Sequence, residues 1–231
     1  MIDGEEMRRR IAGVRERIAQ AASGAGRDPG DVTLVAVCKT MPREAVETAY
    51  EAGLRHFGEN RVQEAAGKFA EFRPADLTLH LIGHLQRNKA KQALSLFDMV
   101  HSLDSLALAE ALAKRGDDGA RPLPVLVEVN VAGEESKFGV GPAETLPLLL
   151  QVARLPGLLL QGLMTIAPLV DDPETVRPFF RRLRELREEG EQRLGRPLPH
   201  LSMGMTNDFE VAIAEGATIV RVGRAIFGER G

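Results

Sequence analysis

The sequence predicts an α/β protein: one domain, residues 1–231, folded as a (β/α)8 barrel of the TIM type with an extra N-terminal helix. Three observations support this. Short apolar runs rich in β-branched residues alternate with longer helical patterns, there are eight such runs, and they recur about every 25 to 30 residues, the length of one strand–helix unit. Such units give parallel strands buried on both faces, and eight of them in 231 residues favour a closed barrel over an open doubly wound sheet.

The first element is an amphipathic helix over about residues 5–24, because Ile11, Val14 and Ile18 recur at helical spacing among Arg and Glu. The predicted strands follow as Thr33–Val37, His56–Gly58, Thr78–Ile82, Met99–His101, Val125–Val131, Leu160–Met164, His200–Met203 and Thr218–Val222. Helical patterns lie between them over Pro42–Ala52, Arg61–Phe72, Leu106–Lys114, Ala143–Arg154, Pro173–Leu194 and Asp208–Glu215. The stretch Gly116–Pro124 is interpreted as a surface loop before the fifth strand.

Composition excludes several functions. Thirty Lys and Arg against 33 Asp and Glu give a net charge of −3, which argues against whole-chain attraction to nucleic acid or to an anionic membrane. The single cysteine, Cys38, excludes an intramolecular disulfide framework and suits a reducing cytosol. The chain opens with no apolar leader, and no apolar run approaches the ~18 residues of a membrane span. We therefore expect a soluble, cytoplasmic protein.

Polar residues stand directly after the predicted strands. In a barrel of this type the carboxyl ends of the strands form the active face, so these positions hold the candidate functional residues. In chain order they are Lys39, Glu59, Asn60, Gly83, His84, Ser102, Asn130, Met164, Thr165, Ser202 and Arg221. Together they predict a ring of mixed polar groups.

Lys39 ends the apolar run of the first strand. A lysine at the mouth of such a strand would be partly desolvated, which favours its neutral amine, and a neutral amine can attack a carbonyl to form a Schiff base. The alternative interpretation is a lysine whose chain reaches out to solvent. Cys38 should point to the opposite face and is interpreted as a small core residue.

Two loops with small residues follow the last two strands. Ser202–Thr206 leads into a helix that begins near Asn207, and Arg221–Arg224 follows the eighth strand. Glycines here would let backbone N–H groups approach an anion, and these two loops are the usual phosphate site of such barrels. Gly204 and Gly223 are equally compatible with ordinary turns. Combined with a lysine at a strand end, the loops indicate an aldehyde-bearing phosphate as the ligand.

Two further features are interpreted without a ligand. His80 alternates with apolar residues and is interpreted as a satisfied core histidine, while His84 has no spacing partner that suggests a metal. We therefore predict no metal site. The Arg- and Glu-rich stretch over 181–193 is interpreted as a solvated helix face with i,i+4 pairs.

Seven segments resemble the pyridoxal phosphate homeostasis proteins, a family related to the barrel domain of alanine racemases. In order they are VAVCKT, HFGENRVQE, LHLIGHLQRNK, HSLD, VEVNVAGEESKFG, GLMTIAP and LSMGMTNDFEVAIAEGATIVRVGRAIFG, and they span about Thr33 to Gly228. The resemblance implies a barrel that holds pyridoxal 5′-phosphate as a Schiff base on Lys39. The cofactor-binding residues that it implies are Lys39, Asn60, Ser202, Met203, Thr206, Arg221, Gly223 and Arg224.

The resemblance also implies how the phosphate is held. Thr206, with the backbone of Gly223 and Arg224, would bind it. The family often has Ser at position 206, where Thr keeps the hydroxyl, and Ser or Thr at position 224. There the arginine removes a hydroxyl contact and retains the backbone N–H, and its side chain could add charge.

By the same similarity the remaining residues surround the ring. Asn60 would lie near the cofactor ring, and Ser202 and Met203 would line the pocket. Arg221 would face the pyridine nitrogen. A permanent cation there disfavours protonation of that nitrogen and so weakens the ring as an electron sink for carbanion chemistry.

The function implied is a non-catalytic carrier that buffers pyridoxal phosphate or delivers it to apo-enzymes, as a monomer. The alternative is a pyridoxal-phosphate-dependent amino-acid racemase, which needs an acid or base on each face of the substrate carbanion. Lys39 could serve one face, but the single tyrosine, Tyr50, lies in the predicted helix after the first strand, and the chain leaves no room for the second domain of such racemases. A barrel without a ligand would leave the lysine and the phosphate-like loops unexplained. Lys137 is either a secondary amine site or a solvent-exposed loop lysine.

Overall fold

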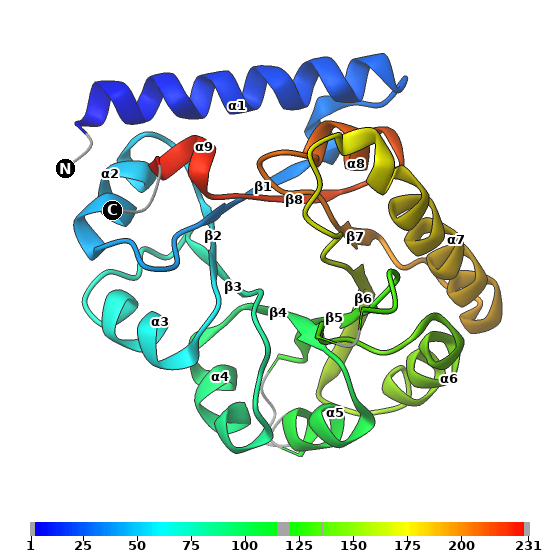
Figure 1. The fold of residues 1–231 in the computed structure, drawn as a ribbon. Coiled ribbons are helices and arrows are strands. Elements are labelled where there is room, and N and C mark those ends of the chain that lie inside the picture. Colours follow the sequence, from blue (N-terminus) through cyan, green and yellow to red (C-terminus); the bar gives the residue numbers. More distant parts are fainter. Residues whose placement is uncertain (1–2, 115–120, 135, 229–231) are drawn as a thin grey trace.

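The computed structural model describes residues 3–114, 121–134 and 136–228. Within them the strands form a closed parallel barrel in the order β1 to β8, with β8 paired to β1 (Figure 1). The strands are β1 Thr33–Val37, β2 His56–Glu59, β3 Thr78–Leu81, β4 Met99–Leu103, β5 Leu123–Glu128, β6 Leu158–Met164, β7 His200–Ser202 and β8 Ile219–Val222. The predicted (β/α)8 barrel is confirmed.

Helices surround the strands in Figure 1. They are α1 Gly4–Gly24, α2 Arg43–Glu51, α3 Val62–Phe69, α4 Ala90–Leu96, α5 Leu106–Ala113, α6 Pro142–Val152, α7 Arg177–Leu194, α8 Phe209–Ala214 and α9 Arg224–Phe227, with 3-10 turns η1 Pro29–Asp31, η2 Arg87–Lys89 and η4 Pro173–Val176. Two of these, α4 and α9, were not predicted. The helix α4 buries only Ala90 and Ala93, which gives a weak apolar period, and α9 has four residues. None of the described helices is long and apolar enough to cross a membrane.

Several predicted boundaries were wrong, and the fifth strand and the helix before the seventh strand show the reasons. The fifth strand begins at Leu123 and ends at Glu128, because the chain then leaves the sheet and Val129 bridges to Val140 instead. The predicted helix over Pro173–Leu194 begins as a 3-10 turn and becomes α-helical at Arg177. Of the predicted loop Gly116–Pro124, residues 116–120 lie outside the described part of the chain and the last two belong to β5.

The predicted N-terminal helix is present as α1 and lies across α2, α8 and α9 (Figure 1). Asp3 caps it by accepting hydrogen bonds from the backbone N–H groups of Glu5 and Glu6. Its buried face is Met7, Ile11, Val14, Ile18 and Ala22. On the same helix, Arg17 pairs with Glu210 of α8 at 2.6 Å and lies 4.4 Å from the ring centroid of Phe209. Helix α1 therefore packs against α8 and α9, the helices that follow the last two strands.

The core has two parts because strand side chains alternate between faces. A large apolar cluster fills the space between the sheet and the helices. A smaller one lies inside the barrel and consists of Val35, Met99, Leu126, Met164 and Ile219. Buried polar side chains share this inward alternation, among them His80, His101, Ser202 and Arg221. The barrel interior is therefore apolar in one layer and polar in the rest.

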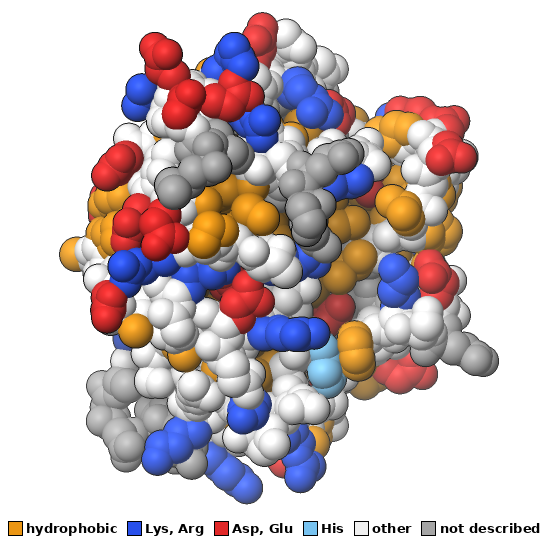
Figure 2. Space-filling model, turned by 60° about the vertical axis from the view of Figure 1, so that its left-hand side comes forward, with side chains coloured by type: hydrophobic (Ala, Val, Ile, Leu, Met, Phe, Trp, Pro, Cys, Tyr) orange, Lys and Arg blue, Asp and Glu red, His pale blue; other side chains and the backbone are white. Residues whose placement is uncertain are grey.

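The surface carries charges of both signs. On the face shown in Figure 2, Lys and Arg side chains stand beside Asp and Glu side chains. Among the residues that the structure describes, three large hydrophobic side chains are exposed: Phe138, Leu159 and Leu169. Leu169 is 82% exposed and belongs to the loop after β6, at the carboxyl face of the barrel.

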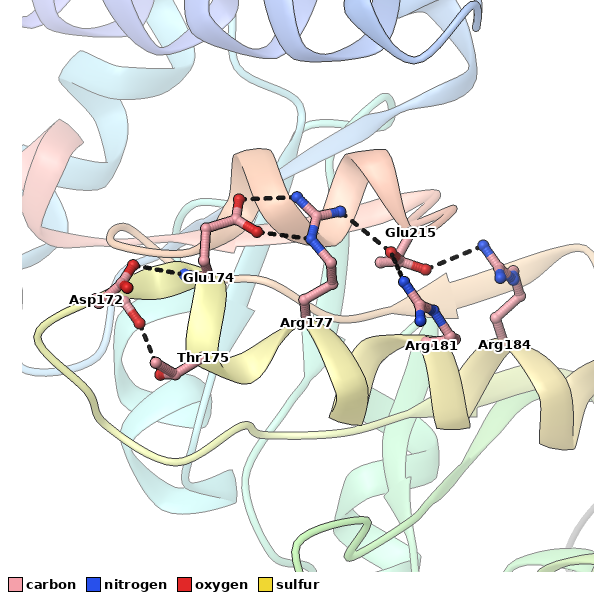
Figure 3. A network of polar contacts seen from close by, with 7 residues as sticks. All are labelled: Asp172, Glu174, Thr175, Arg177, Arg181, Arg184 and Glu215. Carbon is pink, nitrogen blue, oxygen red and sulfur yellow. Dashed lines mark hydrogen bonds and ion pairs between the residues drawn. The ribbon is translucent and has the colours of Figure 1, made fainter.

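The arginines of α7 form ion pairs with another element as well as within the helix. Glu215, which follows α8 and is buried, receives Arg177 and Arg184 at 3.1 Å and Arg181 at 3.3 Å (Figure 3). Pairs within α7 also form, such as Arg184 with Glu188 at 3.7 Å. The interpretation of a wholly solvated face was therefore too narrow, because three arginines bind α7 to the end of α8.

A Glu215→Gln variant should lose about 2 kcal/mol of unfolding free energy, the typical value of hydrogen bonds to a charged group. Burial alone would raise the pKa of Glu215, but hydrogen bonds from Arg177 and Arg181 outweigh it and hold that pKa below its ordinary value. A lowered folded-state pKa contributes stability above the unfolded value of about 4 and loses it as pH falls further. Urea unfolding at pH 7 and below pH 4 should therefore show the deficit shrinking in acid. Glu189→Gln, at the exposed pair with Arg182, is the control and should change little.

Candidate functional site

A pocket opens at the carboxyl ends of β1 and β8, between the loops that follow β6 and β7. Its described lining residues are Val37, Lys39, Met41, Pro168, Leu169, Val170, Pro173, Met205, Thr206, Asn207, Asp208, Arg221, Gly223, Arg224, Phe227 and Gly228. One wall is apolar, and the other combines cationic side chains with backbone N–H groups. This composition suits a ligand with a flat apolar body and an anionic group.

Lys39 sits in a constrained turn after β1. The next residue, Thr40, has φ of 65°, a conformation that non-glycine residues rarely adopt. Its backbone N–H donates to the Glu64 carboxylate, and the Cys38 N–H donates to the Gly58 carbonyl at 3.0 Å. Lys39 itself is half-buried. The turn is therefore held from both sides, which limits where the Lys39 amine can point.

A buried ion pair lies directly behind this turn. Lys68 of α3 is 8% exposed, and Glu59 at the end of β2 is fully buried. Lys68 Nζ contacts the Glu59 carboxylate and donates to the Cys38 carbonyl at 2.6 Å. It also pairs with Glu64 at 3.2 Å, the same carboxylate that holds Thr40. One ammonium group thus fixes both the end of β1 and the start of the Lys39 turn.

Cys38 should be chemically inert in the folded protein. The side chain is fully buried, and burial, together with the negative charge of Glu59, raises the pKa of its thiol well above the ordinary value. We expect iodoacetamide at pH 7.5 to leave native Cys38 unmodified. In about 6–8 M urea, which unfolds most domains, the same reagent should alkylate Cys38 readily. Mass spectrometry of the two samples checks this. Fast alkylation of the native protein would contradict the burial of the thiol.

The loop after β7 requires glycine. Gly204 has φ of +93°, and an added Cβ would lie 2.8 Å from Cα of Phe209. Met205 N–H donates to the Asp208 carboxylate at 2.6 Å, and Arg221 N–H donates to the Gly204 carbonyl at 2.9 Å. The loop is therefore compact and bound to β8, so Thr206 is held at the pocket wall.

The loop after β8 also approaches the first strand closely. A Cβ on Gly223 would lie 3.1 Å from the carbonyl oxygen of Val37. Helix α9 begins at Arg224. The Ile226 and Phe227 N–H groups donate to the Gly223 carbonyl at 3.0 and 2.9 Å, whereas the N–H groups of Arg224 and Ala225 stand before the first acceptor of the helix. Arg224 also donates to the Asn207 side chain at 3.3 Å. These groups, with Thr206 opposite, form a wall suited to an oxyanion.

Arg221 places a buried cation in the pocket. It is 3% exposed and donates to Ser202 Oγ at 2.7 Å and to the Thr165 carbonyl at 2.8 Å. Burial lowers its pKa to about 10, so it stays charged at neutral pH. Nearby, burial and the charge of Asp104 raise the pKa of Glu128 to about 7.

The structure brings five predicted residues into one pocket: Lys39, Thr206, Arg221, Gly223 and Arg224. Three others lie outside its described lining. Ser202 is buried beneath Arg221, Met203 is buried in the large apolar cluster, and Asn60 follows β2 with its backbone against Gly83. Lys137 is half-buried in the loop after β5 and is also outside the lining.

Some residues of the site were not predicted from the sequence. Glu59 was among the polar residues at the strand ends, but its partner Lys68 was not, because the two meet only when β2 and α3 pack together. The apolar wall at 168–170 follows the predicted sixth strand but contains no chemically reactive group. His84 Nδ1 forms a hydrogen bond with the Asp104 carboxylate at 3.1 Å. The His84 ring also stacks on Phe138, with the ring centroids 3.9 Å apart. Among the described residues no group of three or more potential ligands is arranged to hold a metal ion.

The fold and the pocket define an α/β barrel with a lysine at its mouth and a wall suited to an oxyanion. The family model for the alanine racemase N-terminal domain matches residues 10–231. The pyridoxal phosphate homeostasis protein of Aquifex aeolicus is 47% identical over 221 residues, covering 96% of this chain and 97% of its own. That of Pseudomonas aeruginosa is 48% identical over 221 residues, covering 95% and 94%. The chain belongs to the pyridoxal phosphate homeostasis protein family.

Solved structures agree with this assignment. PipY of Synechococcus elongatus with pyridoxal phosphate bound has a TM-score of 0.84 and 39% identity, covering 96% of this chain and all of its own. The D-threonine aldolase of Filomicrobium marinum has a TM-score of 0.76 with 17% identity, covering 98% of this chain and 61% of its own. The second likeness shows the barrel fold alone.

Proposed function

We propose that this chain binds pyridoxal 5′-phosphate, buffers it and delivers it to other proteins without catalysing a reaction of its own. The observation that carries the proposal is that Lys39, the two glycine-containing loops and Arg221 face one pocket. Its relatives are named homeostasis proteins rather than enzymes, and the PipY structure, at 39% identity, holds the same cofactor.

The residues present fit this cofactor. An aldehyde needs an amine, which Lys39 supplies at the strand end. A phosphate needs converging donors, which Thr206 and the backbone at Gly223 and Arg224 supply, in two loops packed too closely to accept a Cβ at position 204 or 223 without a shift. A ring nitrogen needs a donor when it is unprotonated, which Arg221 supplies.

When bound, the cofactor supplies an aldehyde that an amine can hold covalently and reversibly. Lys39 provides that amine, and Lys68 and Glu64 restrict the turn from which it projects. Thr206 and the start of α9 orient the phosphate, which gives most of the binding free energy. Arg221 disfavours a proton on the ring nitrogen, which suits storage better than carbanion chemistry.

Three of the predicted cofactor-binding residues lie outside the described lining of the pocket, and each has a supporting role in the proposal. Ser202 acts by accepting a hydrogen bond from Arg221. Asn60 follows β2, the strand next to β1, and we place it beside the ring. Met203 is buried behind the phosphate loop and supports the pocket from the apolar core.

The proposal is tested by titrating the purified protein with pyridoxal phosphate and with pyridoxal, which lacks the phosphate. We expect a yellow complex that borohydride converts into a permanent mass addition on Lys39, and affinity for pyridoxal lower by on the order of a hundredfold because the phosphate contacts are lost. A protein that stays colourless with both compounds would refute the proposal. Equal affinity for both would refute the assignment of the loops.

The placement of Tyr50 argues against the racemase alternative. Its hydroxyl binds Asp76, and its ring lies beneath Arg55, with the ring centroid 4.1 Å from the guanidinium carbon. Both partners belong to the segments before β2 and β3, at the amino ends of the strands and opposite the pocket. Incubation of the loaded protein with L- or D-alanine in deuterated water decides the matter. We expect no exchange at Cα, and rapid exchange with inversion would restore the racemase.

We further propose that the protein acts in the cytoplasm as a monomer and transfers its cofactor to apo-enzymes. Light scattering should give a mass near 25.2 kDa. Reactivation of an apo-enzyme faster than by cofactor that has first dissociated into solution would support direct transfer. A rate equal to that of free release would limit the role to buffering.

A further inference from the structure

A chain of hydrogen bonds runs through the interior of the barrel. Arg221 Nη1 lies 2.7 Å from Ser202 Oγ, and Ser202 Oγ lies 2.9 Å from His101 Nδ1. His101 Nε2 lies 2.9 Å from His80 Nδ1, and His80 Nε2 lies 3.0 Å from His56 Nδ1. Five side chains from strands β8, β7, β4, β3 and β2 are therefore joined end to end.

The donor chemistry gives this chain one direction. A guanidinium only donates, so Ser202 Oγ accepts from Arg221. Among the described residues the hydroxyl has one other partner, His101 Nδ1, so the hydroxyl hydrogen goes there. His101 then donates from Nε2 to His80 Nδ1, and His80 donates from Nε2 to His56 Nδ1. All three imidazoles are thereby assigned as neutral Nε2–H tautomers.

Burial keeps the three imidazole rings neutral, as the chain of hydrogen bonds requires. It lowers the pKa of His80 to about 3 and that of His101 well below its ordinary value, and it also lowers the pKa of the half-buried His56. A neutral imidazole has one donor and one acceptor, which is what each link uses. A protonated ring would have two donors and would break a link.

The two ends of the chain lie at opposite ends of the barrel. Arg221 lines the pocket at the carboxyl face, whereas His56 lines a separate cavity at the amino ends of the strands, with Thr33, Thr78 and His200. Each internal link satisfies a buried polar atom that would otherwise cost free energy. Shifting the Arg221 guanidinium would leave Ser202 Oγ without the donor that faces it.

We propose that His56, His80 and His101 are positioning residues that act through Ser202 to fix the Arg221 guanidinium, so that its remaining N–H groups face the cofactor ring. This inference rests on the proposed function. The histidines are not among the described lining residues of the pocket, and the hydrogen-bond chain sets the orientation of Arg221, which is. The contribution of Arg221 to binding should therefore depend on side chains at the far end of the barrel.

The direction of the chain is tested without any cofactor. Two-bond ¹H–¹⁵N correlation spectra of the ¹⁵N-labelled full chain should show His56, His80 and His101 as Nε2–H tautomers between about pH 6 and 8, the range over which an ordinary histidine titrates. In Ser202→Ala the Nδ1 resonance of His101 should move to that of an acceptor without a donor. An Nδ1–H tautomer or a protonated ring at any of the three would overturn the assignment.

The positioning role is tested with two ligands: pyridoxal phosphate and its analogue with carbon in place of the ring nitrogen. His80→Phe should weaken pyridoxal phosphate binding about tenfold, because one buried link is lost, and should leave affinity for the analogue unchanged. His200→Phe is the matched control, since His200 is an inward-facing histidine of β7 outside the chain, and should bind both ligands as the wild type does.

The outcomes separate the two proposals. Equal losses for both ligands in His80→Phe would mean general damage to the barrel, and no loss for either would mean that the chain does not act on Arg221. Both results overturn the positioning role. If the wild-type protein binds neither ligand, the proposed function fails along with that role, and the spectra still decide the tautomers.

Discussion

A Lys39→Ala variant should fold normally, stay colourless with added pyridoxal phosphate, and show no mass addition after borohydride. Lys39 is half-buried and lies outside both apolar clusters, so the variant should keep the packed core. Residual binding through Thr206 and the loops should persist, with affinity weakened by at least about a hundredfold. Absorbance titration and mass spectrometry measure both effects.

Lys137→Ala is the matched control. Lys137 is also a lysine of the carboxyl face, half-buried in the loop after β5, but it is not in the described lining of the pocket. This variant should keep the yellow colour and the mass addition on Lys39. A coloured Lys39→Ala together with a colourless Lys137→Ala would transfer the covalent role to position 137.

Replacing Lys68 by Met should produce the largest loss of stability among the residues around the site. Lys68 is the cation for the fully buried Glu59, and removal of one partner of a buried pair costs about 3–5 kcal/mol. The variant also removes the donor to the Cys38 carbonyl, which lies next to Lys39. We therefore expect a lower midpoint of urea unfolding and, in the folded fraction, weaker binding of pyridoxal phosphate.

The pH dependence identifies the cause of that loss. Burial already raises the pKa of Glu59 in the wild type, against the hydrogen bond and charge of Lys68, so removal of Lys68 should raise that folded-state pKa further above its unfolded value. A raised folded-state pKa gives stability that is present below the unfolded pKa and lost as pH rises through the folded one. The variant should therefore approach the wild type near pH 5 and fall furthest behind near pH 8. The double variant Lys68→Met with Glu59→Gln should recover most of the difference, and a deficit that is independent of pH would point to lost packing instead.

The sequence was sufficient for the fold because the strand pattern is local. The run at Thr33–Val37 is followed by polar residues and agrees with β1 at both ends. The fifth strand shows where local pattern stops being enough, since Val129 is as apolar as Val125 and Val127 of the strand but pairs with Val140 across a loop. Nothing within the strand itself distinguishes these two environments.

The candidate site was predictable where one residue carries the chemistry. Lys39 and the glycines at 204 and 223 stand at strand ends, so their convergence follows from barrel geometry, and the resemblance named the ligand. The interior chain was not predictable, because it depends on which side chains of several strands face inward at one level. His80 looked like an ordinary core histidine, and its two histidine partners lie 24 and 21 residues away in the chain.

Helix α1 has a consequence for the order in which the molecule assembles during synthesis. Arg17 and its partner Glu210 are separated by 193 residues, and β1 closes the barrel only when β8 exists. Apart from the contact of α1 with α2, the apolar strip from Met7 to Ala22 therefore has to wait for α8 and α9 before it can dock. Contacts of such long range slow folding and leave apolar surface open meanwhile. A circular permutant that begins at α8 and joins the old termini would bring these partners together early and should refold faster.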